Sequence, residues 1–208
     1  MTAQKLANFT NMEVFKPFFS EGKPCNESRQ LQPVAAFLSS EYVDPKNKSL
    51  SHNFTANKCI DGITDGPDSG NPGDDICHTG YSTPSDPRNF PWLAIDFGVE
   101  VFVKKVVLFN RRECCYSRTR NVTISTSNVL PNSDRNRYYE GSWFDSFAGP
   151  GEPGQQIELT NPLGIRDEAG RYVIVRIREA EEPLNLKEVV AFGYENTPGM
   201  KICERRFG

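Results

Sequence analysis

Short runs of β-branched and aromatic residues, separated by Gly, Pro and Asp, constrain the fold of this chain most. The clearest run is residues 171–178, where Val173, Val175 and Ile177 share one apolar face of an extended strand. No segment longer than a turn or two has the periodicity of an amphipathic helix. The pattern therefore predicts an all-β fold, an antiparallel β-sandwich of the jelly-roll type. The predicted strands are residues 34–38, 92–97, 101–109, 121–125, 156–160, 171–177 and 188–192.

The composition shows that the chain folds and excludes two classes of partner. A chain of 208 residues with 11% aromatic residues is long enough and apolar enough to bury a core. No stretch approaches the roughly 18 uninterrupted apolar residues of a spanning helix, which excludes membrane insertion. A net charge of −3 offers no cationic face for polyphosphate, so we expect no nucleic-acid partner.

Cysteine and asparagine patterns indicate an extracellular location. The six cysteines include no Cys-x-x-Cys pair, which favours disulfides over a zinc or redox site. Five N-glycosylation triplets begin at Asn8, Asn26, Asn47, Asn53 and Asn121. Residues 1–8 lack the apolar run of a signal peptide, so we expect a secreted protein or an ectodomain fragment in its mature or trimmed form.

Charge is distributed unevenly along the chain. Between Cys59 and Pro87 there are six aspartates and no Lys or Arg. This stretch fits a solvated, turn-rich loop and a cation site equally well. Between Lys104 and Arg120, six basic residues accompany a single acid, Glu113, a balance that by itself is typical of a solvated strand end.

Residues 110–118 (Asn-Arg-Arg-Glu-Cys-Cys-Tyr-Ser-Arg) combine arginines, a carboxylate and two adjacent cysteines within the basic stretch, which indicates a binding site rather than a solvated strand end. Arginine presents a planar fork of donors that can grip two vicinal hydroxyls, and a carboxylate between arginines can orient them. Adjacent cysteines have Cα atoms about 3.8 Å apart, so a bond between them would close a small strained ring with an apolar ridge. A polar fork beside an apolar ridge suits a sugar, which has a hydroxyl edge and a C–H face.

Residues 111–118 resemble the Arg-x-Asp-Cys-Cys-x-x-Arg signature of the F-type lectins (fucolectins). These lectins are a branch of the discoidin-like, or coagulation factor 5/8 C-type, β-sandwiches. The resemblance covers about residues 31–194, which implies an irregular arm at 1–30 and a tail at 195–208. It continues in residues 36–42, 57–62, 77–79, 91–96 and 170–173.

The resemblance implies a carbohydrate site. Arg111 and Arg118 would donate to sugar hydroxyls, and Cys114 and Cys115, bonded to each other, would pack against ring carbons. Glu113 stands where the family has aspartate. His78 follows Cys77 directly, one place earlier than the family's ligand histidine, and fits either a ligand or a loop histidine. The implied sugar-binding residues are His78, Arg111, Glu113, Cys114, Cys115 and Arg118.

The resemblance also implies a structural Ca²⁺ site. Asp61 and Glu188 occupy its side-chain ligand positions, and carbonyls near Lys58 and Ile63 would complete the oxygen cage.

The same resemblance leaves Cys77 in need of a new disulfide partner. Lys187 stands where the family has the cysteine that normally pairs with this position. Cys59 is the nearest candidate in sequence, and Cys25 with Cys203 would join the arm to the tail, although six cysteines allow 15 pairings.

Two functional hypotheses from different classes remain open. The first is a calcium-stabilised lectin domain that binds fucosylated or related glycans, with several copies or an oligomer supplying avidity. The alternative is a non-catalytic adhesion or receptor domain that binds protein through the same loops. No His-Glu-x-x-His, Gly-x-Ser-x-Gly or phosphate-loop motif occurs, so we do not expect an enzyme.

Overall fold

The computed structural model describes residues 28–43, 46, 54–64, 76–81, 90–131, 142–161, 169–179 and 181–196. The asparagines of four of the five glycosylation triplets lie outside the described residues, as do His52, Cys25, Cys203 and most of the predicted arm and tail. No helix among the described residues is long and apolar enough to cross a membrane.

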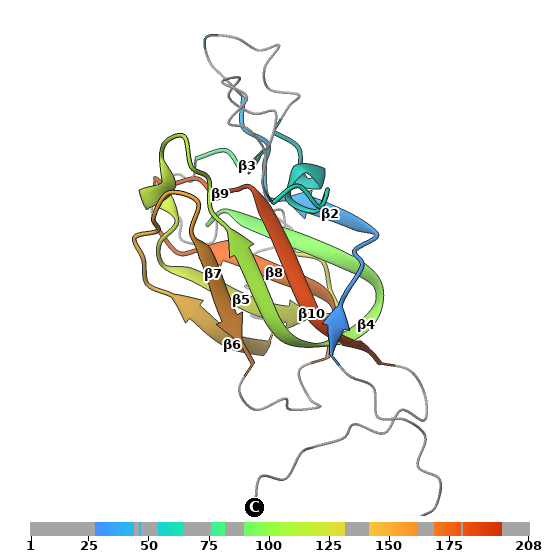
Figure 1. Ribbon diagram of the computed structural model, residues 1–208. Helices are drawn as coiled ribbons and strands as arrows, with labels where there is room; N and C mark the ends of the chain where they lie inside the picture. The colour runs from blue at the N-terminus through green and yellow to red at the C-terminus, as the bar shows by residue number, and fades with distance from the viewer. Residues whose placement is uncertain are drawn as a thin grey trace, which may run out of the picture. The chain divides into compact units, whose positions relative to one another are not determined.

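The predicted antiparallel β-sandwich is confirmed (Figure 1). The main sheet has eight strands in the order β1-β10-β4-β8-β5-β6, with β2 and β7 also paired to β4, and β3 pairs with β9 in a separate ribbon. Every described pairing is antiparallel. The strands are β1 (Arg29–Gln30), β2 (Ala35–Leu38), β3 (Cys77–His78), β4 (Trp92–Phe109), β5 (Val122–Ser127), β6 (Ser142–Phe147), β7 (Gln156–Thr160), β8 (Gly170–Ile177), β9 (Asn185–Leu186) and β10 (Glu188–Glu195).

Strand β4 joins the two layers of the sandwich. Its first part, up to Asp96, pairs with β2 and β8, and its second part, from Val101, pairs with β10 and β7. The register with β8 shifts between these two parts. Gly98 has φ +72° at this point, in the left-handed region that glycine adopts without strain. One strand therefore bends across both sheets.

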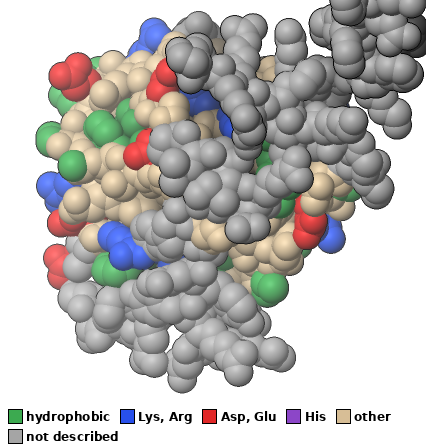
Figure 2. All heavy atoms as spheres, turned by 90° about the horizontal axis from the view of Figure 1, so that it is seen from below, with side chains coloured by type: hydrophobic (Ala, Val, Ile, Leu, Met, Phe, Trp, Pro, Cys, Tyr) green, Lys and Arg blue, Asp and Glu red, His purple; other side chains and the backbone are tan. Residues whose placement is uncertain are grey.

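The core lies between the layers. Val173, Val175 and Ile177 of β8 are fully buried in it, as their alternation predicts. Ile174, on the opposite face of β8, packs with Trp92 and Ala94 in a second, smaller cluster. On the face shown in Figure 2, basic, acidic and apolar side chains of the described residues are interspersed.

The structure differs from the predicted strands in three ways. Residues 92–97 and 101–109 form one strand rather than two. Arg29 and Gln30, assigned to the irregular arm, pair with β10 at the edge of the sheet. The strands β3, β6 and β9 were not predicted. Two of these contain only two residues each, too few for any sequence period to reveal.

Candidate functional site

Asn110 organises the loop that follows β4. Its side chain is 1% exposed, and its Nδ2 donates to the carbonyls of Tyr116 at 3.0 Å and Glu152 at 2.9 Å. Its Oδ1 accepts from the Arg111 amide at 3.1 Å and from Thr119 Oγ1 at 2.8 Å. A single buried amide thus fixes both ends of the 110–119 loop and holds a second loop against it. The short 3₁₀ turn Tyr116–Arg118 lies within this loop.

The two arginines of the predicted site both project from this loop. Arg111 is almost fully buried and pairs with Glu113 through its Nη2, so the carboxylate orients it as the sequence implies. The Arg111 Nε is buried and has no hydrogen-bond partner in the part of the chain that the structure describes. Arg118 is partly exposed and lies over the ring of Tyr81, with Cζ 5.7 Å from the ring centroid.

Cys114 and Cys115 are free thiols, so the predicted bond between them is wrong for this structure. Cys115 has φ 58°, and adjacent Cα atoms are closer than an ordinary disulfide spans, so bonding would require a strained ring that this loop does not adopt. Partial burial is the main cause that raises the pKa of the Cys114 thiol, and a hydrogen bond with Cys115 adds to it. The Cys114 thiol is therefore held in its protonated form.

His78 lies on the β3–β9 ribbon and is 5% exposed. Its Nδ1 donates to the Thr79 carbonyl at 2.6 Å, which leaves Nε2 as a hydrogen-bond acceptor. Burial, with a smaller contribution from the positive charges of Arg111 and Arg118, lowers the pKa of the imidazole to about 4. The structure therefore brings a neutral acceptor under the influence of both arginines.

Three aromatic rings surround His78. Their ring centroids lie 4.5 Å (Tyr42), 5.5 Å (Phe54) and 6.3 Å (Tyr81) from that of the imidazole. Tyr81 is 52% exposed and is also the ring beneath Arg118. The sequence analysis did not select these rings, because only the fold brings residues 42, 54 and 81 together.

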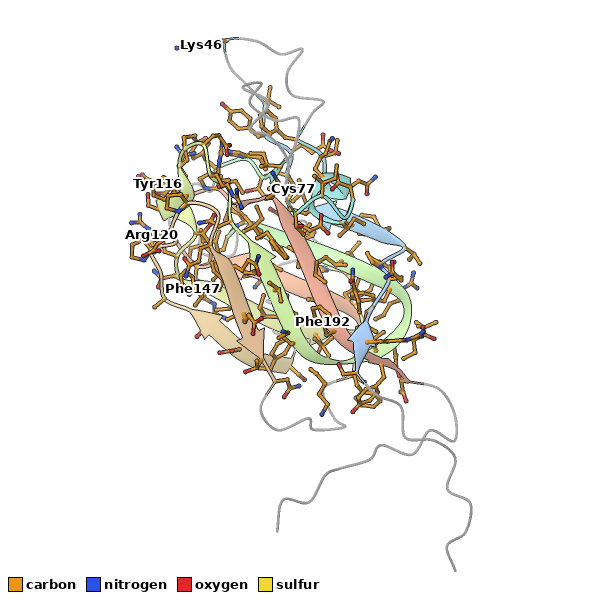
Figure 3. All side chains as sticks on the ribbon, viewed as in Figure 1. Lys46, Cys77, Tyr116, Arg120, Phe147 and Phe192 are labelled. Carbon is orange, nitrogen blue, oxygen red and sulfur yellow. A yellow bond between two sulfur atoms is a disulfide. The ribbon has the colours of Figure 1, made fainter. Side chains whose placement is uncertain are left out.

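Glu182 is a second residue that the sequence analysis missed. Its carboxylate lies 3.5 Å from Arg118 Nε and 3.0 Å from Arg120 Nη2, so one acid serves two arginines. Arg120 also approaches Glu179 at 3.9 Å. The acidic run at 179–182 could have been matched to the basic loop by charge alone. Figure 3 labels Cys77, Tyr116 and Arg120, which lie toward the same end of the sandwich.

The predicted metal ligands Asp61 and Glu188 face each other from a turn and from the start of β10. Glu188 is 3% exposed and accepts from the Gly62 amide at 3.3 Å. Burial and the charge of Asp61 raise the pKa of Glu188 to about 8. Both carboxylates line a cavity of about 150 Å³. The carboxylates of the buried Glu188 and the exposed Asp61 are oxygen donors of the kind that Ca²⁺ prefers.

The rest of the predicted oxygen cage is nearby but incomplete. Lys58 lies in the turn before Asp61, and the Ile63 amide donates to Asp61 Oδ1 at 3.0 Å, which closes that turn. No group of three or more His, Cys, Asp or Glu gathers as metal ligands within the described ranges. A cation here would need backbone oxygens besides the two carboxylates.

The predicted bridge between Cys59 and Cys77 is confirmed, with Cα atoms 5.4 Å apart. It ties the turn that carries Asp61 to the ribbon that carries His78, so it braces both candidate sites.

Comparisons with known proteins agree with this fold. The serum f-lectin (fucolectin) of Morone saxatilis, striped bass, matches with a TM-score of 0.61 and 22% identity over 79% of this chain. This chain spans only 48% of that fucolectin chain. No curated protein matches.

Two further solved structures match this chain over nearly all of their own length. A His 62 mutant of the lectin binding domain of lectinolysin, complexed with Lewis b, has a TM-score of 0.56 and 21% identity over 82% of this chain and 99% of that one. A Streptococcus pneumoniae fucose binding module has a TM-score of 0.55 and 18% identity over 83% of this chain and 100% of that one.

The family comparison identifies the fold more directly. The model of the NedA-like, galactose-binding domain matches residues 58–175, more than half of the chain. The resemblance to discoidin-like domains drawn from the sequence is therefore confirmed. The chain belongs to the F5/F8 type C family of NedA-like, galactose-binding domains.

Proposed function

We propose that this chain is a non-catalytic carbohydrate-binding domain that recognises fucose or a related neutral sugar outside the cell. The observation that carries the proposal is the neutral His78 acceptor near the donors Arg111 and Arg118. A sugar hydroxyl both donates and accepts, so it can bind the imidazole Nε2 and a guanidinium at once. Among the structural neighbours, two are named as fucose binding modules and two are complexed with Lewis b, which supports a fucosylated glycan.

Apolar groups beside these donors suit the C–H face of a pyranose. Tyr81 is exposed next to His78 and Arg118, and the Cys114 and Cys115 thiols follow Glu113 in the same loop. In this proposal Glu113 keeps Arg111 oriented, while Arg118 remains accessible to the ligand. The proposed site then offers a polar side and an apolar side to a bound sugar.

We also propose that Ca²⁺ stabilises the domain through Asp61 and Glu188. The support is electrostatic: the buried Glu188 carboxylate faces the exposed Asp61 carboxylate, and a divalent cation between them would neutralise both. The ion has a structural role here, because it joins the 58–63 turn to β10. No contact between it and the sugar is required.

Titration of the purified domain with L-fucose and with galactose tests the proposed function. We expect saturable fucose binding in Ca²⁺, lost in Arg118→Ala and barely restored in Arg118→Lys, because a lysine cannot form the bidentate fork. Arg29→Ala is the matched control. It also removes one positive charge, here from the exposed ion pair between Arg29 on β1 and Glu195 on β10. No binding of either sugar at millimolar concentration would favour the protein-adhesion hypothesis instead.

A further inference from the structure

Asn185 is a buried amide that the fold does not satisfy. It is 1% exposed, and neither Oδ1 nor Nδ2 has a hydrogen-bond partner among the described residues. Buried side-chain amides are nearly always paired, because an unpaired one loses its bonds to water and gains nothing in return. An amide left in this state therefore calls for a functional explanation.

The strand register directs this amide toward the proposed sugar site. On the β3–β9 ribbon, Cys77 lies opposite Leu186 and His78 lies opposite Asn185. Cys77 and Leu186 belong to the main core, so alternation places His78 and Asn185 on the other face of the ribbon. Directly opposite residues of an antiparallel pair have neighbouring side chains. Asn185 is thus the immediate neighbour of His78.

Asn110 shows that the same fold can satisfy a buried asparagine fully. It is as buried as Asn185, yet its amide makes four hydrogen bonds that hold the 110–119 loop. The unpaired state of Asn185 is therefore not a general property of asparagines at this end of the sandwich. The buried Arg111 Nε, also in the proposed site, lacks a hydrogen-bond partner among the described residues as well.

We propose that Asn185 is a further sugar-contact residue of this site, and that its amide binds a hydroxyl next to the one bound by His78. This inference rests on the proposed function. Asn185 Oδ1 and His78 Nε2 are acceptors, while Asn185 Nδ2 and Arg111 Nε are donors. Donors and acceptors in equal number suit two adjacent neutral hydroxyls. An ionised carboxylate or sulfate has no proton to donate to the two acceptors, whereas a hydroxyl has one, so the ligand class is a neutral sugar with a vicinal diol.

Asn185→Leu tests the inference because stability and affinity should change in opposite directions. Leucine has a similar size and removes the unpaired amide, so we expect a higher melting temperature and at least a tenfold loss of L-fucose affinity. Asn110→Leu is the matched control and should lower the melting temperature, since it breaks four bonds. Asn185→Ala is the second variant, for the case that leucine does not fit the space of the amide. Alanine removes the amide without adding bulk, so Asn185→Ala should also lose at least tenfold in L-fucose affinity.

Monodeoxy analogues of L-fucose separate direct contact from an indirect effect. If Asn185 binds one hydroxyl, the analogue lacking that hydroxyl should bind wild type and Asn185→Ala equally, while the other analogues should still distinguish them. This inference alone would be overturned if wild type binds fucose and the Asn185 variants bind it equally well. It would also be overturned if the variants lose affinity by the same factor for every analogue. Wild type that binds no fucose would overturn both it and the proposed function.

Discussion

At the scale of single residues, burial determines the chemistry of His78. An exposed histidine is partly protonated near neutral pH, whereas this ring is enclosed by aromatic groups and influenced by two arginines. Its Nδ1 proton is committed to the Thr79 carbonyl. The remaining ring nitrogen can therefore only accept a hydrogen bond over the whole physiological range.

The lowered pKa of His78 predicts an acid-sensitive stability. Between pH 6.5 and about 4 the unfolded chain protonates this histidine while the folded chain does not, so stability falls as the pH falls. The full effect is up to about 3 kcal/mol. Fucose affinity should stay constant from pH 8 to 5 and decline only near pH 4.

The variant His78→Asn serves as the reference for these measurements. Its amide can still donate to the Thr79 carbonyl but does not titrate, so urea unfolding should lose the histidine-dependent slope between pH 6.5 and 4. Equal slopes in the variant and wild type would show that His78 titrates normally.

The cysteine assignments predict a simple labelling pattern. Alkylation of the native protein without reductant should modify Cys114 and Cys115, while Cys59 and Cys77 should react only after reduction. The raised pKa of Cys114 should make its reaction slow at pH 7 and faster at higher pH, because the thiolate is the nucleophile. Peptide mapping checks this, and an unmodified peptide with Cys114 bonded to Cys115 would contradict it.

Sequence reasoning found those site residues that lie in one short segment. Arg111, Glu113 and Arg118 lie within eight residues, and their chemistry is visible in the string itself. Asn185 and Glu182 join the site only through pairings with His78 and Arg118, more than 60 residues away in the chain. Such long-range partners leave no local pattern to detect.

At the scale of elements, strands were predictable where burial imposes a period. The alternation in β8 and β7 gave their extents to within one residue, since each has one face on the core. In β6, Trp143 and Phe144 are adjacent, so no alternation marks the strand. Strand β4 was divided in two because Gly98 and the acidic Glu100 interrupt its apolar run, although pairing continues past them.

The contact between the 58–63 turn and β10 predicts a stabilising effect of Ca²⁺. Calcium at about 100 times its dissociation constant should stabilise the fold by about 2.7 kcal/mol, which corresponds to roughly 5–10 °C in melting temperature. The chelator EDTA should remove this shift. In EDTA at pH 9, Glu188→Gln should be more stable than wild type, because it removes a buried charge that faces Asp61.

Two variants make the calcium experiment specific. Asp61→Asn and Glu188→Gln should both lose the calcium-dependent shift, while Glu158→Gln, on the exposed face of β7, should keep it. Identical melting curves in EDTA and in Ca²⁺ for the wild type would show that Asp61 and Glu188 do not hold a calcium ion.

At the scale of the whole molecule, the sandwich acts as a rigid frame for loops at one end. The 110–119 loop, the β3–β9 ribbon and the 179–182 segment are held by a buried amide, a disulfide and an ion pair respectively. These supports are independent of any ligand. We therefore expect the sugar site to be formed before binding, with little reorganisation of the backbone.

The proposed sugar site consists of a few side chains on one domain, which implies weak monovalent binding and a strong dependence on valency. Few buried contacts correspond to a dissociation constant of about 10 μM to 1 mM, or roughly 4–7 kcal/mol. Biotinylated domain displayed on streptavidin should bind a fucosylated surface about 10²–10⁴ times more tightly than the monomer, as measured by surface plasmon resonance. The Arg118→Ala tetramer should not bind, and the Arg29→Ala tetramer should bind like wild type. A monomer that binds as tightly as the tetramer would mean that each chain contacts far more of the glycan than the proposed site residues can.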